Sequence, residues 1–361
     1  MIKISLCMIV KNEEANLKRC LEGIAHYMDE IIIVDTGSTD RTKEIALSFT
    51  DKIYDFTWVN DFSAARNYSI SKASNEYILV LDSDEFTQSI EVSEIKRLIG
   101  QNPNRIGRLQ RINEYTRSGM IYRYKERVNR LFSKENYHYE GIIHEQVTRL
   151  IPADVVGEAV SPGGFDDTYP IPLTVLHSGY EGDLETRRRK TERNISLLKL
   201  AHEQNPEDPY LLYQLGKSYY MEEDYTNACD YLGQALYFDL DPRLEYVQDM
   251  VESYGYSLLN SEQYETASQL LNIYDEFAHS ADFIFLIALI LMNNGKFNEA
   301  IREFLKASEQ KEAKMEGVNG YLAYYNIGVI FECLGDKTNA VKYYKKCGNY
   351  EMAMQRLAAV K

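Results

Sequence analysis

Tyr77-Ile-Leu-Val-Leu-Asp82-Ser83-Asp84 is an apolar run that ends abruptly in acid. The apolar residues predict a strand that is buried on both faces of a sheet. Two carboxylates two positions apart on extended chain would point the same way, because side chains alternate across a strand. At the carboxyl edge of an α/β sheet, such a pair suits Mg²⁺ or Mn²⁺ carrying a diphosphate. A solvated strand end is the alternative, so the surrounding sequence has to decide.

The sequence before this run alternates between strand-like and helix-like segments. Strands are predicted at residues 3–10, 30–34 and 52–54, and helices follow the first two strands and Asp61. This order is typical of a mainly parallel, Rossmann-like α/β sheet. Asp35 follows the second strand and can accept hydrogen bonds from a nucleobase, and Arg66 can pair with phosphate oxygens. The alternatives are a turn residue for Asp35 and a surface charge for Arg66.

Four runs together carry a resemblance to a known family: CMIVKNEE from residue 7, IIIVDTGSTD from 31, DFSAARNY from 61 and ILVLDSDE from 78. In content and spacing they resemble the amino-terminal domain of family 2 glycosyltransferases of the GT-A fold, over roughly residues 3–180. The resemblance implies transfer of a sugar from a nucleotide-sugar with inversion of its anomeric carbon. It also implies that a carboxylate would act as the general base on the acceptor.

The resemblance also implies roles for individual residues. The nucleotide-sugar would be bound by Val10, Asn12, Glu14, Asp35, Arg66, Asp82 and Ser83. Within this set, Asp35 would hold the base, Arg66 the diphosphate and Asp82 the ribose. Asp84 would hold Mn²⁺ or Mg²⁺, and His177 would complete the ligand set. A structural role is the alternative for His177.

The segment from residue 104 to residue 145 is predicted to form the acceptor side of this domain. Residues 104–132 alternate β-like pieces with arginines, which indicates an antiparallel extension, although the arginines also suit the cover of an acidic fold. Glu145 follows this extension in a His-Glu pair and is the candidate general base, with Glu140 in reserve; anchoring a loop is its alternative role. Residues 154–172 are rich in Gly, Pro and acid, which predicts a flap over the site.

Composition limits the classes of function. The chain has 361 residues, which favours two domains, and its formal net charge of −15 argues against non-specific nucleic-acid binding. The odd set of five cysteines has no close pair and predicts reduced thiols in a cytoplasmic protein. We expect no secretory signal, and the longest apolar run, residues 283–292, is too short to span a bilayer and predicts a buried helix.

The carboxyl-terminal half contains a helical repeat. Small residues recur at Ala228, Ala267, Ala300 and Ala340, with steps of 39, 33 and 40 residues, against about 34 in a uniform tetratricopeptide array. Companion small residues recur at Gly216, Gly255, Ala288 and Gly328. The unequal steps predict irregular loops between otherwise stacked helix pairs. The abundant aromatic residues suit a groove for a peptide, and core packing with homodimer formation is the alternative.

We therefore predict an α/β GT-A domain at residues 1–182, a linker helix at 183–208 and all-α tetratricopeptide-like repeats at 209–361. This arrangement resembles bacterial peptide glycosyltransferases. The predicted reaction moves a sugar, with UDP-hexose as the expected donor, to a Cys, Ser or Thr side chain of a peptide or protein that the repeats engage. The alternatives are a transferase of cell-surface polysaccharide or glycolipid synthesis, and a non-catalytic repeat scaffold.

Overall fold

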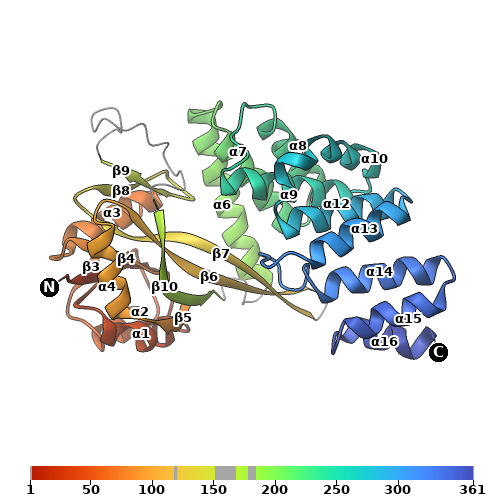
Figure 1. The fold of residues 1–361 in the computed structure, drawn as a ribbon. Coiled ribbons are helices and arrows are strands. Elements are labelled where there is room, and N and C mark those ends of the chain that lie inside the picture. The colour runs from red at the N-terminus through yellow and green to blue at the C-terminus, as the bar shows by residue number, and fades with distance from the viewer. Residues whose placement is uncertain (1, 118–119, 151–167, 178–183, 361) are drawn as a thin grey trace. The chain divides into compact units, whose positions relative to one another are not determined.

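The computed structural model describes residues 2–117, 120–150, 168–177 and 184–360. The chain divides into two compact units, Met1–Gln204 and Asn205–Lys361 (Figure 1). The boundary follows the predicted linker helix, which is α6 (Leu184–Gln204) and is grouped with the first unit. Residues 205–208, which follow α6 and include Pro206, are not helical.

An eight-stranded sheet lies at the centre of the first unit, in the order β3-β2-β1-β4-β7-β6-β10-β5. The strands are β1 (Ile4–Val10), β2 (Glu30–Asp35), β3 (Ile53–Asp55), β4 (Tyr77–Val80), β5 (Glu85–Ile90), β6 (Ile106–Arg117), β7 (Met120–Ser133) and β10 (Thr168–His177). β3, β2, β1 and β4 are parallel to one another, and β7 pairs antiparallel with β4. The predicted parallel sheet is confirmed.

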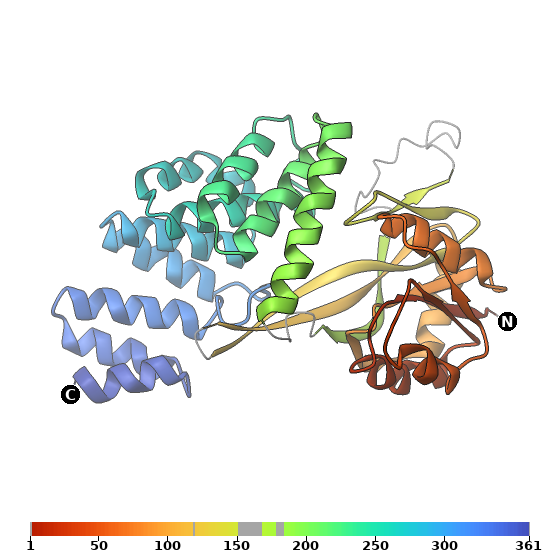
Figure 2. The same cartoon turned by 180° about the vertical axis from the view of Figure 1, so that it is seen from behind.

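The predicted antiparallel extension is also confirmed. β6 and β7 form a long hairpin, visible from both sides in Figures 1 and 2, and β10 pairs with β6 in the parallel sense. A separate two-stranded sheet joins β8 (Tyr137–Glu140) to β9 (Gln146–Arg149). This small sheet brackets the segment that contains Glu145.

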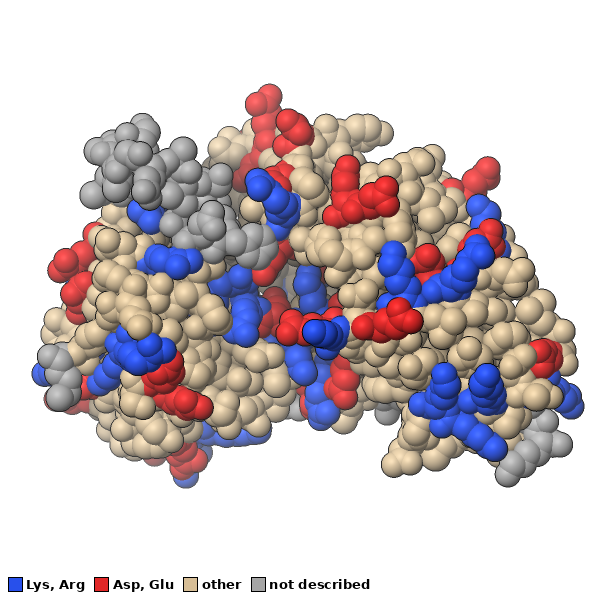
Figure 3. Space-filling view, viewed as in Figure 1, with Lys and Arg blue, Asp and Glu red and all other residues tan. Residues whose placement is uncertain are grey.

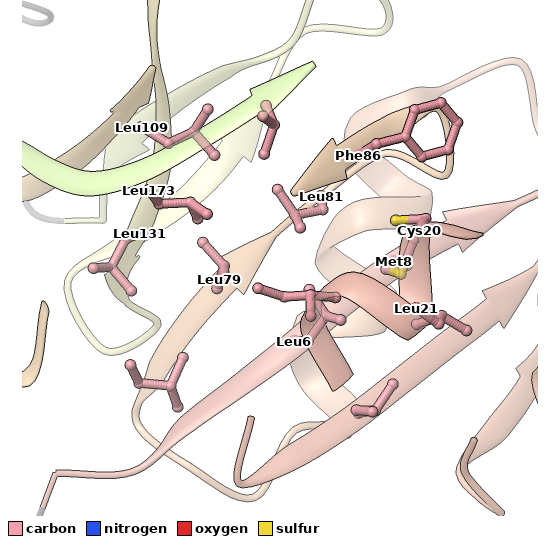
Figure 4. Close-up of a cluster of buried hydrophobic side chains, with 14 of the residues drawn as sticks. Leu6, Met8, Cys20, Leu21, Leu79, Leu81, Phe86, Leu109, Leu131 and Leu173 are labelled. Carbon is pink, nitrogen blue, oxygen red and sulfur yellow. The ribbon is translucent and has the colours of Figure 1, made fainter. Parts of the chain in front are cut away.

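Helices cover both faces of the sheet, because its strands present apolar side chains on both faces. On one face, Leu6 and Met8 of β1 pack with α1 (Leu17–Ile24), α2 (Thr42–Leu47) and α4 (Val92–Gln101). Figure 4 shows Leu21 and Cys20 of α1 beside these side chains. On the other face, Cys7 lies in a cluster with residues of α3 (Phe62–Lys72) and β8.

The second unit is a stack of helices. Its α-helices are α7 (Pro209–Met221), α8 (Tyr225–Ala235), α9 (Glu245–Asn260), α10 (Tyr264–Ala267), α11 (Tyr274–Phe277), α12 (Ala281–Asn293), α13 (Phe297–Ser308), α14 (Tyr321–Cys333), α15 (Lys337–Lys346) and α16 (Glu351–Val360). The predicted buried helix over residues 283–292 is α12. In the second repeat, α9 is followed by α10, the 3₁₀ segment η3 (Ser268–Ile273) and α11 instead of one continuous helix.

Small residues allow the paired helices to approach closely, as predicted. A Cβ atom added to Gly216 of α7 would lie 2.5 Å from the Leu232 side chain of α8. A Cβ added to Gly328 of α14 would lie 2.5 Å from the Tyr344 ring of α15. Any larger side chain at these positions would therefore separate the two helices of a repeat.

The surface charges, the cysteines and the hydropathy of the helices can be compared with the predictions made from composition. Acidic and basic side chains are interspersed on the face shown in Figure 3. All five cysteines are free thiols, and Cys7, Cys20 and Cys347 are buried. Of the helices in the described ranges, none combines the length and the apolar character needed to cross a membrane.

Candidate active site

The carboxyl ends of the parallel strands meet at one edge of the sheet. Val10 is paired in register with Asp35, and Cys7 with Val80, so the residues that follow β1, β2 and β4 emerge side by side. Ligands of open α/β sheets bind at this edge. Seven of the ten predicted site residues end these strands or lie in the loops that follow them: Val10, Asn12, Glu14, Asp35, Asp82, Ser83 and Asp84.

Asp35 combines a turn role with an open acceptor. Its Oδ2 accepts hydrogen bonds from the backbone N–H groups of Gly37 at 3.1 Å and Ser38 at 2.9 Å. Its Oδ1 is buried and has no hydrogen-bond partner among the described residues. A buried acceptor without a partner is costly, so this oxygen is suited to receive an N–H group from a ligand.

Val10, Asn12 and Glu14 connect the loop after β1 to the loop after β2. Each accepts a backbone hydrogen bond: Val10 O from Thr36 N at 2.9 Å, Asn12 Oδ1 from Thr39 N at 2.8 Å and Glu14 Oε2 from Arg41 N at 3.1 Å. The structure therefore gives these three residues a part in holding the loops that flank Asp35.

The geometry expected for the acidic pair is wrong. β4 ends at Val80, and Asp82 and Asp84 belong to a turn in which Glu85 N donates to Asp82 O at 3.1 Å. Because the chain turns, the two carboxylates have different partners. Asp82 faces two arginines, whereas Asp84 Oδ2 lies 3.6 Å from His177 Nε2.

Asp82 is clamped between Arg66 and Arg130. Arg66 Nη2 donates to Asp82 Oδ1 at 2.8 Å, and Arg130 Nη2 donates to Oδ2 at 2.6 Å. Burial alone would raise the pKa of Asp82, but the charges of Arg130 and Arg66 hold it well below its usual range. The carboxylate is therefore ionised throughout the neutral range and fixed in orientation.

Arg66 is a buried ion-pair residue and not a surface charge. It is 6% exposed, and its Nε donates to Glu145 Oε1 while its Nη2 donates to Asp82 Oδ1. Its guanidinium also lies over the ring of Tyr139, 5.4 Å from the centroid. Nη1 is buried and has no partner among the described residues. One donor thus stays available for an anionic ligand such as a phosphate oxygen.

The structure brings Glu145 to this cluster and leaves Glu140 outside it. Glu145 is buried to 10% side-chain exposure against Arg66, whereas Glu140 is exposed and pairs with His138. Burial lowers the pKa of His144, which favours a neutral imidazole beside Glu145. His144 also has a φ of 50°, an uncommon conformation for a residue other than glycine.

The ionic cluster continues into residues that the sequence analysis did not single out. Glu85 is fully buried and accepts hydrogen bonds from Arg130 at 3.0 Å and from Arg111 at 3.3 Å. Arg111 also pairs with Glu126 at 2.9 Å. Arg111 and Arg130 belong to the arginine-rich segment 104–132, so these two arginines are internal partners of the acidic residues and do not merely cover the surface.

Asp84 and His177 offer a pair of donors to a cation. Ligand distances of about 2.0–2.2 Å on one metal ion allow two donor atoms to lie about 3–4 Å apart, and Asp84 Oδ2 and His177 Nε2 are separated by 3.6 Å. The residues described here contain no group of three or more His, Cys, Asp or Glu that could hold a metal ion by itself. Phosphate oxygens and water commonly fill the other positions around Mg²⁺, so the pair fits a nucleotide-bound cation.

Ser83 and Glu13 lie beside this pair. Ser83 is 5% exposed and lies close to the Glu13 carboxyl, which accepts a hydrogen bond from Asn16 Nδ2 at 3.1 Å. Burial, reinforced by the charge of Asp84, raises the pKa of Glu13. Most of the predicted flap, including Asp166 and Asp167, lies outside the described residues, and its last residues, from Thr168 onward, belong to β10.

Comparison with known proteins agrees with both units. The family model for glycosyl transferase family 2 matches residues 5–147. Tetratricopeptide-repeat models match residues 210–237, 281–314 and 321–347. The solved structure of YrrB, described as a tetratricopeptide-repeat protein with an unusual peptide-binding site, is 21% identical with a TM-score of 0.40 and covers 49% of this chain and 87% of its own.

Two curated relatives span the boundary between the units. A TPR repeat-containing protein of Synechococcus elongatus is 34% identical over 237 residues, covering 65% of this chain and 57% of the relative. The SPbeta prophage-derived glycosyltransferase SunS of Bacillus subtilis is 29% identical over 253 residues, covering 64% of this chain and 53% of SunS. The chain thus spans about half the length of these relatives. It carries a glycosyl transferase family 2 domain followed by carboxyl-terminal tetratricopeptide repeats.

Proposed function

We propose that this protein is an inverting glycosyltransferase that moves a sugar from a nucleotide-sugar, with UDP-hexose as the donor, to a Cys, Ser or Thr side chain of a peptide or protein. The observation that carries the proposal is the position of Arg66. It joins Asp82 to Glu145 and keeps a further buried N–H group without a partner in the described ranges. The candidate donor site and the candidate base thus share one residue.

On the donor side, the open Oδ1 of Asp35 accepts the imide N–H of uracil, and the loop containing Asn12 borders the nucleoside. Asp82, fixed by Arg66 and Arg130, accepts from the ribose hydroxyl groups. The remaining N–H of Arg66 donates to the diphosphate. A charged donor that is already oriented stabilises the leaving group as its negative charge grows.

On the acceptor side, Glu145 takes the proton from the acceptor hydroxyl or thiol as its oxygen or sulfur attacks the anomeric carbon. The bond from that carbon to the phosphate oxygen breaks on the opposite face, which inverts the configuration and releases UDP. The ion pair with Arg66 orients the Glu145 carboxylate before the acceptor arrives. The neutral imidazole of His144 avoids placing a second positive charge beside it.

Asp84 and His177 would hold Mn²⁺ or Mg²⁺, which supplies positive charge to the departing diphosphate. The acidic surroundings support this assignment, since the carboxylates of Asp84, Glu13 and Asp82 lie close to one another. A bound cation offsets the repulsion between these carboxylates and a diphosphate.

The repeats engage the polypeptide acceptor in this proposal. Partly buried polar contacts join helices of neighbouring repeats, such as the Lys217 ammonium of α7, which donates to Asp249 at 2.6 Å and to Ser253 at 3.1 Å, both on α9. Such contacts fix helix positions, and stacked pairs present an extended surface for a peptide. The five free thiols suit a reducing, cytoplasmic setting for the reaction.

A nucleotide panel tests the donor assignment. Isothermal titration calorimetry with UDP, GDP, CDP and TDP, each with Mn²⁺, should show tighter binding for UDP and TDP than for CDP, because uracil and thymine present a ring N–H to Asp35 and cytosine does not. Guanine also carries a ring N–H, so GDP tests whether the site accepts a purine. Hydrolysis of the matching sugar nucleotide should follow the same preference. Equal affinity for all four nucleotides, or no affinity for any, would contradict the donor assignment.

A further inference from the structure

Asn113 connects His177 to the ionic cluster of the sheet. It lies on β6, is 6% exposed and reaches one residue on each neighbouring strand. Its Nδ2 donates to Glu126 Oε1 on β7, and its Oδ1 lies 2.7 Å from His177 Nδ1 at the end of β10. Glu126 is held in turn by Arg111, whose Nε donates to it at 3.0 Å.

These contacts determine which imidazole nitrogen carries the proton. An ionised carboxylate only accepts hydrogen bonds, so the Asn113 amide presents its NH₂ group to Glu126 and its oxygen to His177. That oxygen also only accepts, and therefore His177 Nδ1 must carry a hydrogen. In the neutral imidazole the lone pair is then on Nε2, the nitrogen that lies 3.6 Å from Asp84 Oδ2.

We propose that Asn113 is a positioning residue that fixes His177 in the tautomer able to bind a divalent cation beside Asp84, and that Glu126 and Arg111 fix Asn113. The proposal rests on the cation assignment made above. Partners that hold the second nitrogen of a ligating histidine orient the ring and select its tautomer. The hydrogen bonds that would orient His177 thus run from β10 through Asn113 on β6 to Glu126 on β7.

Mn²⁺ affinity of the full-length protein, measured by calorimetry in saturating UDP, tests this role. Asn113→Leu removes the acceptor at similar volume and should weaken Mn²⁺ binding about 10- to 100-fold, the usual effect of losing such a partner. Asn113→Asp keeps an acceptor oxygen for Nδ1–H and should recover part of the affinity. Glu114→Gln is the matched control, because Glu114 is the next residue on β6 and pairs with Arg123.

A spectroscopic measurement on the wild-type protein makes the test independent of the variants' folding. Two-bond ¹H–¹⁵N correlation of histidine-labelled protein, with the His177 signals assigned by their loss in His177→Gln, should show the Nδ1–H tautomer. The Nε2–H tautomer would overturn the proposal.

The metal titrations separate this proposal from the cation assignment. If His177→Gln loses Mn²⁺ affinity but Asn113→Leu does not, the positioning role is overturned and the cation assignment stands. If His177→Gln binds Mn²⁺ as tightly as the wild type, His177 is not a ligand and both fail. Weaker binding in both variants, with the Glu114→Gln control unchanged, supports both.

Discussion

Arg66 and Glu145 form a buried ion pair although 79 residues separate them in the chain. The same guanidinium donates to Asp82 at 2.8 Å, so the residue between the candidate base and the candidate ribose-binding carboxylate is one arginine of α3. The following changes probe this arrangement and its surroundings.

Glu145→Gln separates chemistry from binding. Glutamine keeps the shape and hydrogen-bonding reach of the side chain but cannot take a proton, so sugar transfer should fall about 10²- to 10⁴-fold, with UDP affinity little changed. Steady-state kinetics with calorimetry checks this, and Glu140→Gln is the control because Glu140 is exposed. Near-normal turnover in Glu145→Gln would move the base elsewhere. A thiol acceptor would give the smaller loss, since thiols ionise readily.

Asp35→Asn tests the nucleobase contact while preserving the turn. One oxygen remains for the backbone N–H groups of Gly37 and Ser38, but an amide NH₂ then faces the ligand N–H. UDP affinity should fall about 10- to 100-fold, the effect of losing a hydrogen bond to a charged group. Asp55→Ala is the control, since Asp55 ends the neighbouring strand β3 and is exposed. An unchanged UDP dissociation constant in Asp35→Asn would remove Asp35 from the site.

Asp84→Ala and metal removal should have the same effect. Because the proposed cation would stabilise the leaving group, either change should reduce turnover by at least about two orders of magnitude, corresponding to a few kcal/mol of transition-state stabilisation. Turnover in EDTA and its recovery on adding Mn²⁺ or Mg²⁺ provide the measurement. Full activity of the wild type in excess EDTA would contradict the metal dependence.

Removal of the repeats tests their role in acceptor binding. A protein ending after Gln204 keeps the whole first unit and should still bind UDP. Its transfer to peptide should weaken mainly through a higher KM for the peptide, because the chemistry is retained while binding surface is lost. UDP binding is measured first to establish that the fragment is folded. Equal KM values for fragment and full-length protein would limit the repeats to a structural or oligomeric role.

Glu252 makes the stability of the repeats depend on pH. Burial, with Asp282 and Asp249 nearby, raises its pKa from 4.5 to about 7, although Lys314 acts against this. The pKa of Glu252 is higher in the folded state than in the unfolded state, so the protonated side chain contributes to the free energy of unfolding. This contribution is complete below about pH 4.5 and is lost as the pH rises through about 7. Glu252→Gln should therefore stabilise the repeats at pH 8 by up to about 3 kcal/mol relative to the wild type and change little at pH 4.5. Chemical denaturation at both pH values checks this, and an equal effect at both would contradict it.

The sequence predicted the parts of the fold that depend on local pattern. Strands ending in Val10 and Asp35 follow from apolar runs, and the repeats follow from small residues such as Gly216 at helix contacts. The broken second helix of the second repeat, with η3 at residues 268–273, was not predicted, because its residues carry no Gly or Pro that would signal a break.

The site residues at the ends of the parallel strands were predicted from the sequence. The residues that are brought together by the pairing of the later strands were missed. Arg130 contacts Glu85, and Asn113 is linked to Glu85 through Glu126 and Arg111. These contacts depend on the register in which β7, β6, β10 and β5 pair, and sequence alone does not say which face of such strands is buried. One signal was present: Arg111 and Asn113 share a face of β6 two residues apart. The turn at Asp82 was not predicted, because part of what holds it is a side-chain contact, the hydrogen bond from Asp82 N to Glu85 Oε2 at 3.0 Å.

Sugar transfer to a peptide is the central claim, and product analysis tests it most directly. The full-length protein is incubated with Mn²⁺, UDP-hexoses and peptides containing Cys, Ser or Thr, and the peptide mass and anomeric configuration are determined by mass spectrometry and NMR. We predict a peptide that gains one sugar of inverted configuration, and greatly reduced product with Glu145→Gln. Release of UDP without any glycosylated peptide, or a product of retained configuration, would contradict it.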